Sequence, residues 1–199
     1  MGYYMDHRFY IVIQYIFFFL LSGNNCKDSG KTSPRQKLRF DLIYIRDSQI
    51  IYPSLVDPNS YALATAPADT VYIAKSSLPN AGLGVFASRR IMRFSYFGPY
   101  GGFKRNPHLT QGTNSYAWNV PDKSGNIMYQ IDASDPKSSN WLRFINCPNN
   151  FTQRNLMSLV YHGDIFYLSI RNIEVGEELL VYYGDDYADK LGIDTKKFH

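Results

Sequence analysis

Cysteine is scarce in this sequence. Only two of the 199 residues are cysteine, Cys26 and Cys147, and no Cys-x-x-Cys pair or Cys/His cluster accompanies them. This pattern excludes the common zinc-site spacings and a disulfide framework. We therefore expect no metal in the functional site.

The chain also lacks a strong overall charge. The net charge is +4, and residues 24–46 account for all of it, with six basic and two acidic side chains (6 − 2 = +4). The rest of the chain is neutral, so its folded part has no nucleic-acid-binding signature. The basic segment is either a solvated linker or a contact for an acidic partner or nucleic acid.

Long apolar runs are missing except near the N-terminus, where residues 9–21 read FYIVIQYIFFFLL after His7 and Arg8. At about thirteen residues this run is short for a membrane span of about twenty, so we do not expect the chain in a membrane. Its shape is that of a secretory signal peptide. A buried strand or helix, or a wrongly assigned start of the reading frame, are the alternatives.

Composition divides the chain into segments. Residues 1–37 combine the apolar run with a basic linker rich in small and polar residues. Residues 38–69 contain one expected strand, 38–45, and a proline-containing loop. We assign residues 70–194 to the main domain and 195–199 to a tail.

Aromatic residues are abundant, at 16% with 17 tyrosines and 13 phenylalanines, and many lie in short β-like runs. Such residues favour strands. The expected strands are 70–76, 84–91, 115–120, 126–133, 164–171 and 178–183, with a further strand-like run at 91–97. Residues 103–114 and 122–126 are expected connectors, and 140–147 is the one helical candidate. The predicted class is mostly β with few short helices.

One glycine turn raises a question of function. Gly82 and Gly84 lie in LPNAGLGVFASRR, residues 78–90. A dinucleotide-binding turn needs a third glycine and a following helix, whereas Ala87 and another strand-like run follow here. Phosphate binding is therefore weakly supported, and an ordinary tight turn is the alternative.

Seven blocks occur in an informative order: KSSLPNAGLGVF, FGPYGG, NSYAWNV, NWLRFINC, QRNL, YHGDIFY and ELLVYYGDDYADKLGI. Together they resemble the SET lysine methyltransferases, and more closely the PR-domain branch, the PRDM family. The resemblance covers about residues 70–194. It implies a SET-domain (β-clip) fold of several small curved sheets.

The resemblance also implies a site. S-adenosylmethionine would be the cofactor, bound by Ala81, Gly82, Leu83, Tyr116, Asn146 and Cys147. Tyr183 would be the catalytic tyrosine beside the transferring methyl group. The substrate would contact Thr113, Asn114, Ser115, Tyr116, Ala117, Trp118, Asn119 and Tyr183, and Tyr100 and Tyr167 are weaker candidates for lining a lysine channel. Without the resemblance, these aromatics would be interpreted as core residues.

Methyl transfer from a sulfonium to an amine is an in-line displacement, so the protein contributes positioning and electrostatics rather than a metal or covalent intermediate. The lysine amine, with an ordinary pKa of about 10.4, must first lose its proton. An apolar aromatic channel disfavours its charged form. Tyrosine rings stabilise the sulfonium through cation–π contacts.

The implied function is a nuclear histone-lysine N-methyltransferase acting on the histone H3 tail. Most SET proteins have Asn-His-Ser-Cys where this chain has Asn146-Cys147-Pro148, so a PR domain that serves as a protein-interaction module in transcriptional regulation is the alternative. A secreted β-rich binding protein is a third reading, which rests on the apolar run. No direct DNA-binding module is recognisable, so targeting to chromatin would have to come from partners or from a part of the protein outside this sequence.

Overall fold

The structure, a computed structural model, describes residues 42–48, 57–107, 115–122 and 124–184. The chain divides into two compact units, Met1–Arg39 and Phe40–His199, and all described residues belong to the second. The predictions for residues 1–37 and 195–199, and for Thr113 and Asn114, lie outside the described residues. Within the described ranges, no helix has the length and apolar character that crossing a membrane would require.

Short strands dominate the described residues, as predicted. The strands are β1 (Ile43–Ile45), β2 (Val71–Lys75), β3 (Leu83–Ala87), β4 (Ser95–Phe97), β5 (Phe103–Arg105), β6 (Ala117–Pro121), β7 (Ile127–Asp132), β8 (Leu156–Tyr161) and β9 (Asp164–Ser169). The helical elements are η2 (Pro58–Ser60), α2 (Tyr61–Ala64), η4 (Trp141–Phe144) and η5 (Phe151–Gln153). The prediction of a mostly β chain with few short helices is confirmed.

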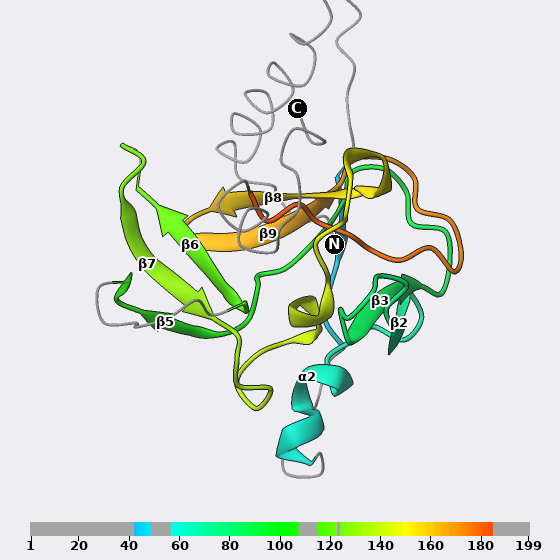
Figure 1. Ribbon diagram of the computed structural model, residues 1–199, viewed down its shortest axis with the longest axis horizontal. Coiled ribbons are helices and arrows are strands. Elements are labelled where there is room, and N and C mark those ends of the chain that lie inside the picture. The colour runs from blue at the N-terminus through cyan, green and yellow to red at the C-terminus, as the bar shows by residue number, and fades with distance from the viewer. Residues whose placement is uncertain (1–41, 49–56, 108–114, 123, 185–199) are drawn as a thin grey trace, which may run out of the picture. The chain divides into compact units, whose positions relative to one another are not determined.

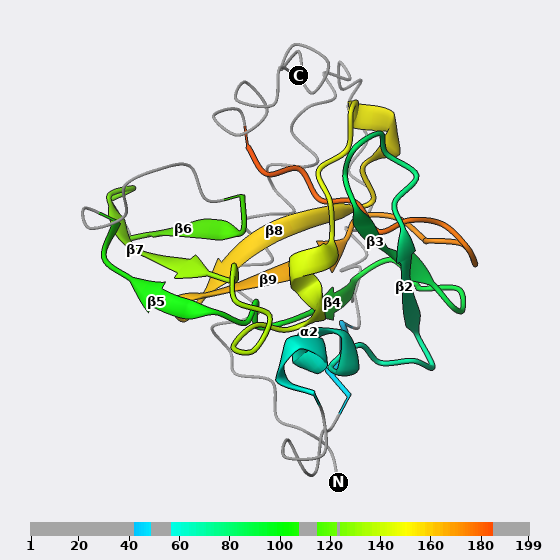
Figure 2. The ribbon, with the colours of Figure 1, turned by 60° about the horizontal axis from the view of Figure 1, so that its bottom comes forward.

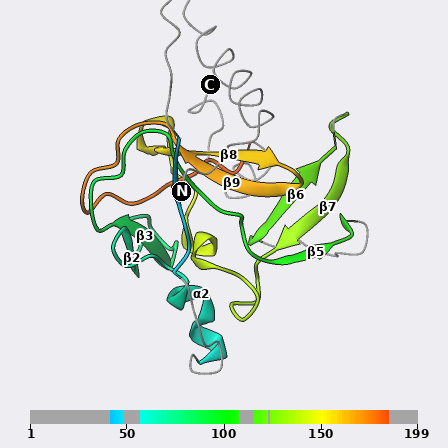
Figure 3. The ribbon, with the colours of Figure 1, turned by 180° about the vertical axis from the view of Figure 1, so that it is seen from behind.

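The strands form three small sheets. One has the order β1-β4-β9-β8, with β1 parallel to β4 and the other neighbours antiparallel. The β2–β3 hairpin is the second, and β5-β7-β6 is the third, entirely antiparallel. Figure 1 shows the three-stranded sheet and the β2–β3 hairpin on opposite sides of β8 and β9, and the turned view in Figure 2 and the rear view in Figure 3 agree.

The hydrophobic core lies where these sheets meet η4. In β9, Ile165, Tyr167, Leu168 and Ser169 are all buried, so this strand lies inside the core. Phe97 of β4 packs edge-on against Trp141 of η4, with ring centres 5.5 Å apart. The core therefore holds η4, and the chain that follows it, against the four-stranded sheet.

Two strands were not predicted. Residues 103–105 lie in an expected connector, yet they form β5 against β7, where Arg105 makes an ion pair with the buried carboxylate of Asp132 at 3.0 Å. All three β5 residues are exposed, so no apolar alternation marked them. Residues 156–161 form β8, whose only buried side chains are Leu156 and Leu159, a three-residue spacing that does not indicate a strand.

Two other segments differ from their predicted form. The expected helix over 140–147 is only the 3₁₀ turn η4, because Ile145 already has extended dihedrals (φ −77°, ψ 117°). The expected strand 178–183 is not a regular strand. Its backbone makes isolated bridges to three different places, Phe86–Glu178, Asn146–Leu180 and Leu156–Val181, so no single partner provides a ladder.

Candidate functional site

A cavity of about 450 Å³ lies where four separate parts of the chain meet. This volume falls in the range of about 300–1,000 Å³ that is typical of small-molecule sites. The lining residues come from the loop before β3, from the residues entering β6, from η4 and the segment after it, and from Tyr183. They are Leu78, Pro79, Asn80, Ala81, Ser115, Tyr116, Arg143, Asn146, Cys147, Asn149 and Tyr183.

The structure thus brings together Ala81, Tyr116, Asn146, Cys147 and Tyr183, to which the family resemblance assigned cofactor binding and catalysis. These residues span more than one hundred positions of the chain. Their meeting depends on the path of 178–183 between β3 and the segment after η4.

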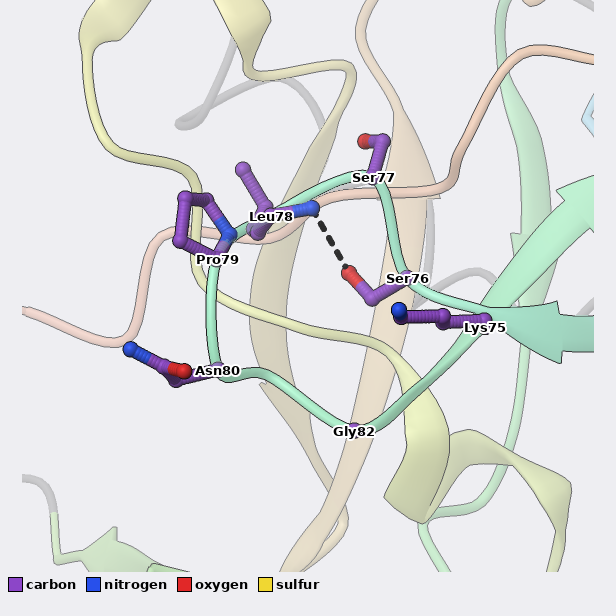
Figure 4. A pocket seen from close by; sticks show the side chains of 7 residues that line it. All are labelled: Lys75, Ser76, Ser77, Leu78, Pro79, Asn80 and Gly82. Atoms are coloured by element: carbon purple, nitrogen blue, oxygen red, sulfur yellow. Dashed lines mark hydrogen bonds between the residues drawn. The ribbon is translucent and has the colours of Figure 1, made fainter.

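Other predicted residues lie beside this cavity rather than on its wall. Gly82 borders a second hollow of about 690 Å³ inside the loop of residues 75–80 (Figure 4). The Leu83 carbonyl accepts a hydrogen bond from Asn146 Nδ2 at 2.9 Å. Ala117 and Asn119 belong to β6, and Asn119 is exposed, with its Oδ1 accepting from Gln130 Nε2 at 2.8 Å.

Glycine is favoured at positions 82 and 84 for different structural reasons. Gly82 has φ +71°, and a Cβ there would have no neighbour within 4 Å, so its backbone conformation alone favours glycine. At Gly84 a Cβ would lie 2.2 Å from Glu178 Oε1. The second glycine therefore makes room for a buried carboxylate.

That carboxylate was not singled out in the sequence. Glu178 is 6% exposed, and it accepts hydrogen bonds from Ser76 Oγ (2.7 Å), from Ser77 N (2.8 Å) and Oγ, and from Asn146 Nδ2 (3.3 Å). A glutamate in an apparently regular strand gives no sequence signal of such a role. Glu178 thus joins Ser77, about one hundred positions earlier in the chain, to Asn146, thirty-two positions earlier.

Aromatic rings continue from the cavity into the core. Trp118 packs edge-on against Tyr183 with ring centres 5.4 Å apart and lies 5.8 Å from Tyr167. Tyr100 lies 6.0 Å from Tyr167 and 6.5 Å from Trp118. We call Tyr100, Trp118, Tyr167 and Tyr183 the aromatic cluster.

Tyr167 is the innermost member of the aromatic cluster, with no exposed surface. Burial, followed by the proximity of Tyr100 and Tyr183, raises the pKa of its hydroxyl well above the usual value. The Trp118 side chain offsets part of this rise, yet no described residue reaches hydrogen-bonding geometry with the hydroxyl. A buried hydroxyl without a partner is unusual and marks a place where a bound polar group could be satisfied.

Tyr183 joins the aromatic cluster to the cavity. Its hydroxyl donates to the Ile145 carbonyl, and a phenolic oxygen that donates one bond has the chemistry to accept others. The Cys147 thiol lies nearby, and burial raises its pKa, with partial compensation from the Tyr183 backbone. Tyr182 instead lies near Arg154, so the two adjacent tyrosines have different surroundings.

Arg143 supplies a fixed positive charge on the cavity wall. Its Nε donates to the Ala133 carbonyl at 2.8 Å and an Nη to the Ser134 carbonyl at 3.1 Å. The guanidinium lies 4.2 Å from the centre of the Tyr116 ring. Arg143 was part of a recognised block, but no role was predicted for it.

The donor set fits S-adenosylmethionine better than a metal. Within the described ranges no group of three or more His, Cys, Asp or Glu side chains is placed to hold a metal ion. The cavity offers a cation at Arg143, an amide at Asn146 and aromatic faces at Tyr116 and Tyr183. These suit a carboxylate, an ammonium and a sulfonium respectively, which are the charged groups of that cofactor.

Fold and site together define a SET/PR-type domain, and comparisons with known proteins agree. Residues 71–194 match the PR domain of PR domain zinc finger protein 2. The solved methyltransferase domain of human PR domain-containing protein 2 superimposes with a TM-score of 0.55 at 27% identity, covering 77% of this chain and 97% of that one. The chain therefore belongs to the PR-domain family.

Among curated proteins, the chain is 42% identical over 119 residues to the Caenorhabditis elegans histone-lysine N-methyltransferase set-17, covering 60% of this chain and 42% of that protein. It is 38% identical over 138 residues to the human histone-lysine N-methyltransferase PRDM7, covering 68% of this chain and 27% of that protein. The chain thus spans less than half the length of these relatives. Their names support the methyltransferase class.

Proposed function

We propose that this PR domain transfers a methyl group from S-adenosylmethionine to a lysine of the histone H3 tail, in the nucleus. The observation that carries the proposal is the junction of the 450 Å³ cavity with the aromatic cluster at Tyr183. One side offers polar and cationic groups for a cofactor, and the other offers rings for an apolar lysine side chain. Methyl transfer needs those two binding regions to meet at one point.

The cofactor side would be built from the loop 78–83 and the segment after η4. Asn146, Ala81 and Tyr116 would hold the cofactor by contacts on the cavity wall, with Cys147 beside them. Arg143 would face its carboxylate, because its guanidinium is already fixed by two backbone carbonyls. When bound, the cofactor supplies the electrophilic methyl group.

The lysine side would be the aromatic cluster. Trp118 is half-buried and lies 5.8 Å from fully buried Tyr167, so a lysine side chain inserted beside Trp118 would exchange water for ring contacts. Such surroundings lower the pKa of an amine, which favours the neutral nucleophile. The unpartnered Tyr167 hydroxyl could bond to that amine or to a water beside it.

Tyr183 would align the amine for in-line attack. Since its hydroxyl hydrogen points to the Ile145 carbonyl, its oxygen can accept from the amine and direct the nitrogen lone pair toward the methyl group. Positioning and desolvation together are the protein's contribution, and no described histidine or carboxylate is needed as a general base.

The peptide would approach along β6. This strand is at the edge of its sheet in the order β5-β7-β6, and residues 115–119 lead from the cavity into it. An extended peptide can add to such an edge through main-chain hydrogen bonds. The placement would bring a lysine side chain close to Trp118.

The test is a methylation assay with the full chain, labelled S-adenosylmethionine and recombinant histone H3. Label in H3, located by mass spectrometry to a tail lysine, is the expected result. Cofactor binding without transfer to any histone would contradict the enzymatic proposal and favour the interaction-module alternative, for which the Asn146-Cys147-Pro148 sequence is the motive.

A further inference from the structure

We propose that Glu178 is a positioning residue that holds the cofactor loop, residues 76–83, and Asn146 in their binding geometry. The inference rests on the proposed function, since it assigns a purpose to a contact beside the proposed cofactor site. Glu178 does not line the cavity itself. It would act through residues on both sides of the cavity.

On the loop side, both carboxylate oxygens are engaged. Oε1 accepts from Ser76 Oγ, and Oε2 accepts from the backbone N–H and the hydroxyl of Ser77. Ser76 Oγ in turn accepts from Leu78 N at 3.1 Å, the bond drawn in Figure 4. A chain of hydrogen bonds therefore leads from Glu178 to Leu78, which lines the cavity.

On the other side, Glu178 fixes the orientation of the Asn146 amide. The Nδ2 group donates to Leu83 O at 2.9 Å and to Glu178 Oε1 at 3.3 Å, so two acceptors hold its two hydrogens. No donor from the described residues bonds the amide oxygen. Asn146 can therefore present an acceptor to a ligand without reorienting.

The carboxylate is itself held in place by its own backbone and by Gly84. The Glu178 carbonyl accepts a hydrogen bond from Asn155 Nδ2 at 2.7 Å. The Glu178 backbone also forms a β-bridge with Phe86 of β3. Asn155 is fully buried, and Gly84 leaves the space in which the carboxylate sits. A rigid anchor of this kind reduces the ordering that a ligand would have to impose on the loop.

The neighbouring residue provides a matched control. Glu177 belongs to the same turn but bonds with Arg171 and, at 3.3 Å, with Asn155. None of its bonds within the described residues reaches the loop 76–83 or Asn146. Losing the Glu177 charge would affect the turn, whereas losing the Glu178 charge would affect both sides of the cavity.

The first measurement is calorimetry of S-adenosylmethionine binding to the full chain, at a temperature where circular dichroism shows every variant folded. We expect Glu178→Gln, whose amide would face the Ser77 N–H, to weaken binding by about tenfold or more. Glu177→Gln should stay within about twofold of wild type. In turnover, Glu178→Gln should raise KM for the cofactor more than it lowers kcat.

The second measurement needs no cofactor. Hydrogen–deuterium exchange of residues 76–83 should be faster in Glu178→Gln than in wild type or Glu177→Gln. Should Glu178→Gln not fold, Ser77→Ala tests the same contact, because Ser77 is exposed and its hydroxyl bonds only one carboxylate oxygen. It should show a smaller rise in both exchange and Kd.

The proposal would be overturned if Glu178→Gln lowered the melting temperature but kept wild-type cofactor affinity and wild-type hydrogen exchange in the loop. Glu178 would then contribute to stability alone. Failure of the wild-type protein to bind S-adenosylmethionine would be a different result. It would refute the proposed function and the link to cofactor, while the exchange data would still decide whether Glu178 holds the loop.

Discussion

Replacing Tyr183 with phenylalanine removes one hydroxyl that has two consequences in this structure. The first concerns stability, because the hydroxyl donates to the Ile145 carbonyl. Such a bond contributes about 0.5–1.5 kcal/mol. For a domain of this size we expect the melting temperature to fall by roughly 1–6 °C, while Trp118 continues to pack on the retained ring.

The second consequence concerns the rate of methyl transfer. If the Tyr183 oxygen aligns the attacking amine, its loss removes a hydrogen bond that is made in the transition state. Such losses cost about 2–4 kcal/mol, which corresponds to roughly thirty- to a thousand-fold in rate. Cofactor affinity should change little, because the ring still forms its part of the cavity wall.

Single-turnover methylation of a histone H3 peptide, with wild type and with Tyr183→Phe, measures this rate directly. Tyr182→Phe is the matched control, since Tyr182 is adjacent but lies near Arg154 rather than at the aromatic cluster. Equal rates for wild type and Tyr183→Phe, or equal losses at both tyrosines, would refute the assigned role. A rate loss accompanied by an equal loss of cofactor affinity would also refute it, because the hydroxyl would then act in binding.

Four further substitutions have distinct expected outcomes. Gly84→Ala should destabilise the protein by about 1–3 kcal/mol because its Cβ overlaps the Glu178 carboxylate, whereas Gly82→Ala should cost about 1 kcal/mol through its positive φ alone; chemical denaturation compares them. Tyr167→Phe should leave the melting temperature unchanged or raised, because it removes a buried hydroxyl that bonds to none of the described residues, yet alter methylation kinetics. Burial opposes ionisation of Glu177, but its hydrogen bonds and arginine partner give a net lowered pKa. The ionised Glu177 side chain therefore stabilises the fold above its ordinary pKa of 4.5, and this stabilisation is lost as the pH falls below that value. Glu177→Gln should consequently flatten the acid side of a plot of melting temperature against pH.

The class of fold was predictable because strand formation leaves a local mark. Apolar and aromatic residues gather in short runs such as 164–171, and glycine, proline and asparagine separate these runs. The strand β5 was missed because all its residues are exposed, and β8 because its buried residues are three apart. Burial in these strands depends on partners elsewhere in the chain.

The segment 178–183 shows the same limit at the site. Its sequence has the composition of a strand, but its backbone contacts three separate places, β3, Asn146 and β8. No local pattern encodes three partners. Similarly, the predicted helix over 140–147 ends after one turn, because Ile145 is extended and the Asn146 backbone pairs with Leu180 and Val181, which lie far later in the chain.

The sequence by itself determined the mostly β class and the glycine turn, and the resemblance carried by its ordered blocks picked out Tyr183 and Asn146. Those features depend on residue type and order. Tertiary structure alone decided that Gly84 accommodates Glu178, that Glu178 joins a loop about one hundred residues away, and that Arg143 lies on the cavity wall. The physical reason is that a buried carboxylate is stable only where donors converge on it, and the donors that converge here come from segments that only the folded chain brings together.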